Sequence, residues 1–313
     1  MSSRQFGVLA ALALAWGASF LFIKVIIDAG GAPVGVSFGR SALGALVLAP
    51  AAWRMRSQFP HTPAAWLMLV ILGFFNFALP WTLFAVAAQH APSSVSAIVN
   101  SSSPLWAAIF ATILVKADRL NRVRIAGLLC GFLGVVLLMG QDLLRSGGSA
   151  SAFAVVLMLA ATLCYGFCAV AIRRWMHEVP AIPLAFGQLA IAACFLLPVA
   201  AVSGLPTPSL GANAILSLLA LGLLNSGIGV MCMMWLIHEV GPVRAIVVTY
   251  LIPPIGVFLG WLVLGETIGW SLVLGLAFVI AGVALVQQIS PRAVIRRLTF
   301  RLASNSAEAA APD

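Results

Sequence analysis

The sequence predicts an all-α integral membrane protein with ten transmembrane helices, arranged as two inverted repeats of five helices. Three observations lead to this fold class: an apolar composition, long stretches without charge, and an internal repeat. Of the 313 residues, 62% are hydrophobic and 8% are charged, whereas a soluble domain has about 25% charged residues. So few charges cannot cover a surface that faces water, which excludes a soluble globular domain and a disordered chain.

Charged residues are absent from two long stretches, residues 57–115 and 179–238. A helix needs about 20 apolar residues to cross the hydrocarbon core, so each stretch has room for two crossings and a short loop. Lipid offers no hydrogen bonds to the backbone, which restricts crossing segments to helices and closed β-barrels. Barrel strands alternate apolar and polar residues. Residues 6–27 are apolar on all sides, so we predict helices.

Proline, glycine and charged residues divide the chain into ten expected crossings. The first five cover residues 6–27, 34–53, 65–88, 93–115 and 123–140, and the second five cover residues 152–172, 181–203, 212–237, 242–264 and 269–289. The first crossing could be a signal peptide with Arg4 as its basic end, but it is too long and lacks a convincing cleavage site. We expect two five-helix domains, 1–146 and 147–290, followed by a basic cytoplasmic tail, 291–313.

Basic residues gather on one side of this arrangement. Loops that stay in the cytoplasm retain Lys and Arg. The side that holds the N-terminus carries Arg4, Arg54, Arg56, Lys116, Arg119, Arg122, Arg124, Arg173, Arg174, Arg244, Arg292, Arg296, Arg297 and Arg301. The other side carries Lys24 and Arg145. We therefore expect a multi-pass protein of the cytoplasmic membrane with both termini in the cytoplasm, and the net charge of +9 follows from this topology.

The two halves repeat each other at a shift of 148 or 149 residues. The recurring residues are Phe38-Gly39 as Phe186-Gly187, Pro50 as Pro198, Asn76 as Asn225, His90 as His238, and Gly127 with Gly134 as Gly275 with Gly282. Each repeat contains five crossings, an odd number, so the second half must enter the membrane from the opposite side. Inverted repeats are typical of secondary transporters, which bind substrate near the midplane between the halves.

Further short motifs are spread over nearly the whole chain. They are Trp16-Gly17, Arg40, Pro104, Pro253-Pro254, Leu264-Gly265-Glu266, Gly275 and Gly282. In these residues the sequence resembles the drug/metabolite transporter superfamily, specifically its ten-helix carriers with two EamA-type repeats. Where the first repeat of that family usually has Gly-Glu, this chain has Ala117-Asp118. The resemblance implies a carrier, and an exporter rather than an importer, for amino acids, sugars, nucleotide-derived metabolites or toxic compounds.

Arg40 lies inside the second crossing, roughly 10 Å along the helix from its outer end. A charge at membrane depth costs about 2.5 kcal/mol or more, so such a residue usually faces a cavity or a partner. One interpretation is a cation that binds an anionic group of the substrate or pairs with Asp28. The alternative is an arginine that extends to the outer headgroups.

Three further charged residues lie near the outer ends of crossings. Lys24 and Asp28 are four residues apart and could form a gate or coupling pair, or an anchor at the interface. Glu266 begins the short turn into the tenth crossing. A carboxylate near a helix N-terminus is favoured by the helix dipole, so a structural cap is the alternative to a coupling role.

Polar and aromatic residues inside the crossings predict a substrate site near the midplane. The candidate substrate-binding residues are Arg40, Trp16, Asn76, Asn100, Ser101, Tyr165, Asn225 and Tyr250. Polar groups in hydrocarbon need partners, and proline frees backbone carbonyls that can line a cavity. We expect helices kinked at Pro104 and at Pro253-Pro254 to flank this site. Hydrogen bonds between helices, without substrate contact, are the alternative role for these polar residues.

The alternatives to a transporter are a polytopic membrane enzyme and a non-transporting scaffold or channel. Residues 35–39 fit the serine-hydrolase pattern G-x-S-x-G, and Ser37 with His90 is the pair that an intramembrane protease would use. We expect no enzyme, cofactor, metal site or nucleic-acid partner, because the four His are not clustered and no phosphate-binding loop is present. The expected partners are a small-molecule substrate and membrane lipid, and the expected state is a monomer or a homodimer.

The topology predicts where a reporter attached after Asp313 will lie. A green fluorescent protein fused there will fluoresce, and an alkaline phosphatase fused there will be inactive, because both will stay in the cytoplasm. The same two reporters inserted after Gly30, between the first two crossings, provide the control with the opposite result. Phosphatase activity from the C-terminal fusion would contradict the topology.

Overall fold

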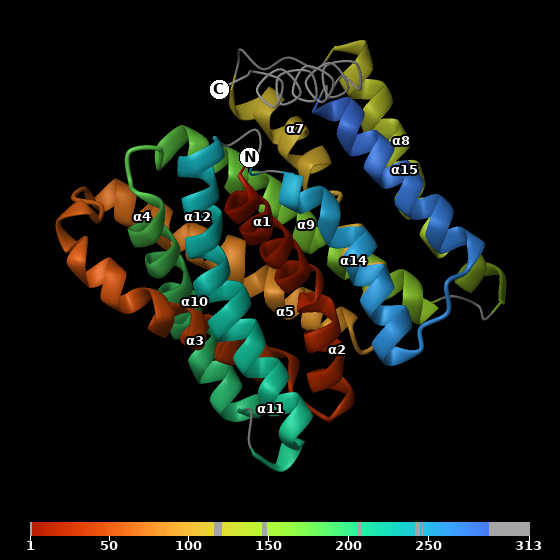
Figure 1. The fold of residues 1–313 in the computed structure, drawn as a ribbon, viewed down its shortest axis with the longest axis horizontal. Coiled ribbons are helices and arrows are strands. Elements are labelled where there is room, and N and C mark those ends of the chain that lie inside the picture. The colour runs from red at the N-terminus through yellow and green to blue at the C-terminus, as the bar shows by residue number, and fades with distance from the viewer. Residues whose placement is uncertain are drawn as a thin grey trace, which may run out of the picture.

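The computed structural model describes residues 2–115, 121–145, 149–205, 208–241, 245 and 247–287, and this part of the chain contains helices and no strand. Figure 1 shows the helices gathered into one bundle. The first half contains α1 (Ser3–Gly17), α2 (Ser19–Asp28), α3 (Pro33–Arg54), α4 (Pro63–Gly73), α5 (Leu79–Ala87), α6 (Ser93–Asn100), α7 (Ser103–Leu114) and α8 (Arg122–Arg145). The second half contains α9 (Ser149–Trp175), α10 (Ala181–Ser203), α11 (Ala212–Leu219), α12 (Gly229–Val240), α14 (Val247–Leu264) and α15 (Trp270–Val286).

All ten expected crossings are occupied by helices, which confirms the predicted fold class. Eight helical segments are long and apolar enough to cross a membrane, α15 is apolar but 17 residues long, and α8 completes the set. Large apolar side chains such as Leu129 and Val273 are exposed, as expected where lipid is the solvent. The expected boundary between residues 146 and 147 stays a prediction, and the tail 291–313 lies outside the described residues.

Two crossings are interrupted near their middle. The first breaks at Ala18, between α1 and α2. The fourth breaks between α6 and α7, where the hydroxyls of Ser101 and Ser102 donate to the carbonyls of Ile98 and Val99 at 2.6 and 2.7 Å. This is the break expected beside Pro104. At Pro253-Pro254, α14 continues through both prolines as one helix, and the kink expected there stays a prediction.

The third and eighth crossings each contain a stretch of π-helix. The first is η2 (Phe74–Ala78), between α4 and α5, and the second is η4 (Ala220–Ile228), between α11 and α12. Each stretch holds one of the two repeat-related asparagines, Asn76 or Asn225. In η4, the Ser226 hydroxyl donates to the carbonyl of Leu221, five residues earlier, at 2.9 Å. Such wide turns are rare and occur often at functional sites.

The two halves meet most closely where α8 packs against α15, side by side at one edge of the bundle in Figure 1. Glycines face each other along this contact. A Cβ atom added to Gly282 would lie 2.4 Å from the backbone nitrogen of Gly131 and 2.6 Å from the carbonyl oxygen of Gly127. Small residues of this kind let two helix backbones touch in a membrane. The glycine pair Gly127/Gly131 thus serves packing between the two halves of this chain.

We expect Gly282→Ala to lower the melting temperature of the detergent-purified protein. The added methyl group has no free space and must separate two backbones, at a cost of about 1–3 kcal/mol. The control is Gly7→Ala, because nothing lies within 4 Å of a Cβ atom at that position. Fluorescence-detected size-exclusion after heating measures both variants. Equal melting temperatures would contradict the close contact of α8 and α15.

Candidate functional site

A cavity of about 710 Å³ lies between the two halves. All eight residues predicted to bind substrate line it: Trp16, Arg40, Asn76, Asn100, Ser101, Tyr165, Asn225 and Tyr250. The other lining residues are mostly apolar and aromatic. Among the described residues that line the cavity, Arg40 is the one with a formal charge. The structure therefore brings the predicted residues together, and their contact with a substrate stays a prediction.

The Arg40 side chain is held inside the protein by two contacts. Its Nε atom donates to the hydroxyl of Ser226 on η4 at 2.9 Å. Its guanidinium carbon lies 3.9 Å from the ring centroid of Trp81 on α5, in a cation–π contact. The extension of Arg40 to the outer headgroups is therefore wrong. Its pairing with Asp28 is also wrong, because Asp28 is paired with Lys24.

Two hydrogen bonds connect the residues beside the α1–α2 break to η4. The indole Nε1 of Trp16 donates to the backbone carbonyl of Asn225 at 3.0 Å. The side-chain Nδ2 of Asn225 donates to the hydroxyl of Ser19 at 2.7 Å. Trp16 thus presents an apolar ring to the cavity while its one donor is satisfied. These contacts connect the first half to the second at the centre of the bundle.

Asn76 is held from the second half. Its Nδ2 atom donates to Oε1 of Gln188 on α10 at 2.8 Å, and Gln188 is 2% exposed. Gln188 is not among the residues predicted from the sequence, although it lies 148 residues after Arg40 and next to the recurring Phe186-Gly187. The signal for Gln188 in the sequence is that a polar residue stands at the position of the second repeat that is equivalent to Arg40. Trp81 and Ser226 were missed because their roles depend on Arg40.

The other predicted residues form the walls of the cavity. The backbone carbonyl of Asn100 accepts a hydrogen bond from the Ser103 hydroxyl at 2.6 Å, at the break between α6 and α7. The Tyr165 ring is stacked on Phe84, with ring centroids 6.3 Å apart. The Tyr250 hydroxyl donates to Oε1 of Gln287. These walls offer aromatic surface with few free polar groups, which suits the apolar part of a small organic molecule.

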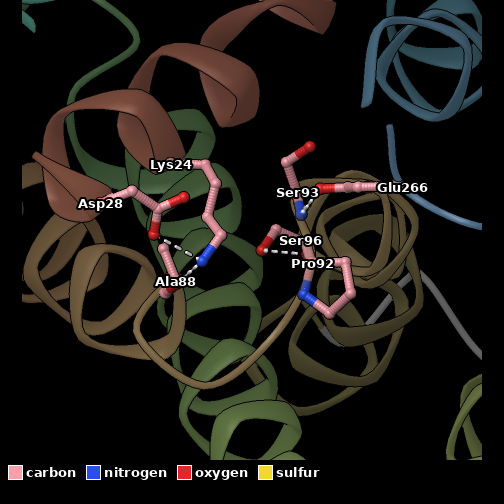
Figure 2. Close-up of polar contacts among 7 residues, drawn as sticks. All are labelled: Lys24, Asp28, Ala88, Pro92, Ser93, Ser96 and Glu266. Carbon is pink, nitrogen blue, oxygen red and sulfur yellow. Dashed lines mark hydrogen bonds and ion pairs between the residues drawn. The ribbon is translucent and has the colours of Figure 1, made fainter. Parts of the chain in front are cut away.

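Figure 2 shows the polar contacts at the end of the bundle that contains Lys24. Lys24 Nζ lies 2.7 Å from Asp28 Oδ1, and it also donates to the backbone carbonyl of Ala88 at 3.0 Å. Lys24 thus connects the last turn of α2 to the end of α5. The predicted pair of Lys24 and Asp28 exists, and it lies outside the cavity lining.

Glu266 connects the two halves at the same end (Figure 2). Its two carboxylate oxygens accept hydrogen bonds from the backbone N–H groups of Ser93, at 2.6 Å, and Ser94, at 3.0 Å. Both donors belong to the first turn of α6, where backbone N–H groups have no partner within the helix. Glu266 is therefore a helix cap. The helix that it caps is α6 of the other half, not the tenth crossing as its position suggested.

The cavity lining also extends toward the opposite end of the bundle. It includes Ile172 near the end of α9 and Thr249 near the start of α14. These helix ends lie on the side of Arg4, whose guanidinium stands over the ring of Trp235 on α12 at 5.2 Å. Ile23, next to Lys24 in the chain, also lines the cavity, so the lining runs from the level of Lys24 toward the end with Arg4.

Ser37 and His90, the pair considered for proteolysis, have separate partners. The Ser37 hydroxyl donates to the carbonyl of Pro33 at 3.0 Å, and the His90 ring lies against Phe153, with centroids 5.8 Å apart. Within the described residues, no group of three His, Cys, Asp or Glu side chains could hold a metal ion.

Comparisons with known proteins agree with the two-repeat architecture over most of the chain. The profile of the EamA-like transporter family matches residues 5–140 and again residues 152–287. A crystal structure has a TM-score of 0.64 with this chain at 20% identity, over 93% of this chain and 99% of that one. At this identity the likeness shows the fold alone.

Three curated relatives are named as transporters. An uncharacterized transporter of Archaeoglobus fulgidus is 25% identical, over 91% of this chain and 98% of the relative. The uncharacterized inner membrane transporter YedA of Escherichia coli is 28% identical, over 90% of each chain. A protein of Streptantibioticus cattleyicolor named as a probable terminal-alkyne amino-acid exporter is 24% identical, over 87% of this chain and 90% of the relative.

We expect Glu266→Ala to lower the melting temperature by several degrees. The substitution removes two charge-assisted hydrogen bonds and leaves two N–H groups of α6 without a partner, a loss of about 1–3 kcal/mol. The matched control is Glu178→Ala, because the Glu178 side chain is 90% exposed. Thermal unfolding of both purified variants is the measurement. A Glu266→Ala variant as stable as the control would show that the cap does not stabilise the fold.

Proposed function

Because the chain belongs to the EamA-like transporter family, we propose that it is a secondary transporter that exports a small metabolite, an amino acid or a similar compound. Transport proceeds by alternating access, with the substrate bound in the central cavity. The proposal includes both termini in the cytoplasm, as the distribution of basic residues predicts.

The environment of Arg40 is the main observation that supports this proposal. The guanidinium lies in a largely apolar cavity, stacked on Trp81, and no carboxylate of the described residues pairs with it. A positive charge in such a place is costly and favours the arrival of an anionic group. The planar guanidinium presents a fork of N–H donors that fits a carboxylate. The cavity thus combines one cationic contact with apolar walls, as a small organic acid or an apolar amino acid requires.

The two ends of the cavity support alternating access. At one end Glu266 joins the two halves through the N–H groups of Ser93 and Ser94, and the cavity lining also reaches toward the end of Arg4. With the N-terminus in the cytoplasm, this is the arrangement that receives substrate from inside the cell. Release to the outside then requires the contacts of Lys24 and Glu266 to open. We assign the gating role of these residues to this step.

The relative named as an amino-acid exporter supports both the substrate class and the direction of transport. The repeat architecture supports the mechanism, since an odd number of crossings in each half produces two oppositely oriented units around one site. A channel more often forms its pathway from several identical chains, whereas here both halves of the cavity belong to one chain.

Purified protein in proteoliposomes, supplied with a panel of amino acids and other small metabolites, tests this function. Uptake and efflux are measured with and without a pH gradient. We expect Arg40→Ala to abolish transport of the substrate that the panel identifies and Arg40→Lys to retain a small part of it, because lysine keeps the charge but loses the fork. The matched control is Arg56→Ala, since Arg56 also stands over a tryptophan, Trp53, but outside the cavity.

Full transport by the Arg40→Ala variant would show that Arg40 does not bind the substrate. If folded protein moves no solute of the panel, the scaffold alternative replaces the transporter.

A further inference from the structure

Arg40 and Gln188 occupy equivalent places in the two halves. They are 148 residues apart, on α3 and α10, which pack against each other. Each side chain makes a hydrogen bond to a π-helical stretch in the opposite half. Arg40 donates to Ser226 on η4 at 2.9 Å, and Gln188 accepts from Asn76 on η2 at 2.8 Å. The structure thus has two related polar contacts, one charged and one neutral.

The contact of Gln188 fixes the direction of the Asn76 amide. Gln188 is 2% exposed, and its Oε1 atom takes the Nδ2 donor of Asn76. A carboxamide carries its donor and its acceptor on opposite branches. With Nδ2 committed to Gln188, the acceptor Oδ1 of Asn76 points away from α10. Asn76 is half-buried and lines the cavity, so this oxygen is placed to serve a ligand there.

Asn76 and Arg40 both line the cavity. Phe77, which follows Asn76, lies against Trp81 with ring centroids 4.8 Å apart. Trp81 also contacts the guanidinium of Arg40, at 3.9 Å. The cavity lining therefore includes a fork of donors on α3 and an amide on η2.

We infer that Gln188 is a positioning residue, which orients Asn76 so that the amide oxygen accepts a hydrogen bond from the substrate while Arg40 binds its anionic group. The inference rests on the proposed function and narrows its substrate. A molecule that uses both contacts is a small carboxylate with an N–H donor close to the carboxylate, and an α-ammonium group is the compact form of that donor.

The test compares two probes that differ by this donor. L-Leucine carries an α-ammonium group, and 4-methylpentanoate is the same molecule without it. Both have an apolar side chain that suits the cavity walls. Titration calorimetry on the full-length detergent-purified protein gives the affinity for each. We expect the wild type to bind L-leucine at least tenfold more tightly than 4-methylpentanoate, because a charged donor gains a buried acceptor.

Three variants separate positioning from stability. Gln188→Met keeps the volume without a hydrogen bond, and we expect it to reduce the preference for L-leucine over 4-methylpentanoate to about twofold or less. Asn76→Leu has the same effect, and the double variant loses no more than either single one, because Gln188 acts through Asn76. Gln188→Glu still accepts from Asn76 and keeps most of the preference. The matched control is Gln58→Met, at an exposed position in η1 (Arg56–Gln58).

Each possible result either supports or overturns the inference. A preference that survives in Gln188→Met, or equal affinity of the wild type for both probes, overturns it and leaves the transport function standing. If Gln188→Met does not elute as a folded protein, a preference that survives in Asn76→Leu overturns it in the same way. Binding of neither probe overturns the inference, and the proposed function falls as well only if the proteoliposome panel also shows no transport.

Discussion

The hydrocarbon core of a bilayer offers no hydrogen-bond partner, so polar groups inside this protein are stabilised by partners within the chain. The main chain meets this constraint with helices. The side chains meet it at the centre of the bundle, where Asn225 donates to Ser19 and Asn76 donates to Gln188. Because each of these bonds joins one half of the chain to the other, the same constraint that fixes the helices also fixes how the halves meet around the cavity.

The two halves are related in sequence, yet they are not equal at the site. Equivalent positions on α3 and α10 hold Arg40 and Gln188, and equivalent positions on η2 and η4 hold Phe77 and Ser226. The two related halves therefore contribute different polar contacts, a charged one from Arg40 and a neutral amide one from Gln188. The polar contacts around the cavity therefore differ between the two halves, although the halves are related in sequence.

The polar contacts of Lys24, Asp28 and Glu266 lie at the end of the bundle, not at its centre. Lys24 and Asp28 have side chains that are 21% and 51% exposed. Water can replace the partners of such exposed groups when they separate. The glycine contact of α8 with α15 differs, because it depends on close backbone packing that no solvent can replace.

The sequence by itself determined the ten crossings, the two repeats and eight of the residues that line the cavity. These features follow from local composition, because residues that must leave water are recognised by their own chemistry. The tertiary structure decided which partner each polar residue takes. Glu266 caps α6 instead of its own neighbouring helix, Arg40 stacks on Trp81 instead of pairing with Asp28, and Gln188 joins the site through Asn76. These partners lie between 41 and 173 residues away in the chain. A pattern along the sequence does not give distances between helices, so only the packing of the bundle determines these pairs.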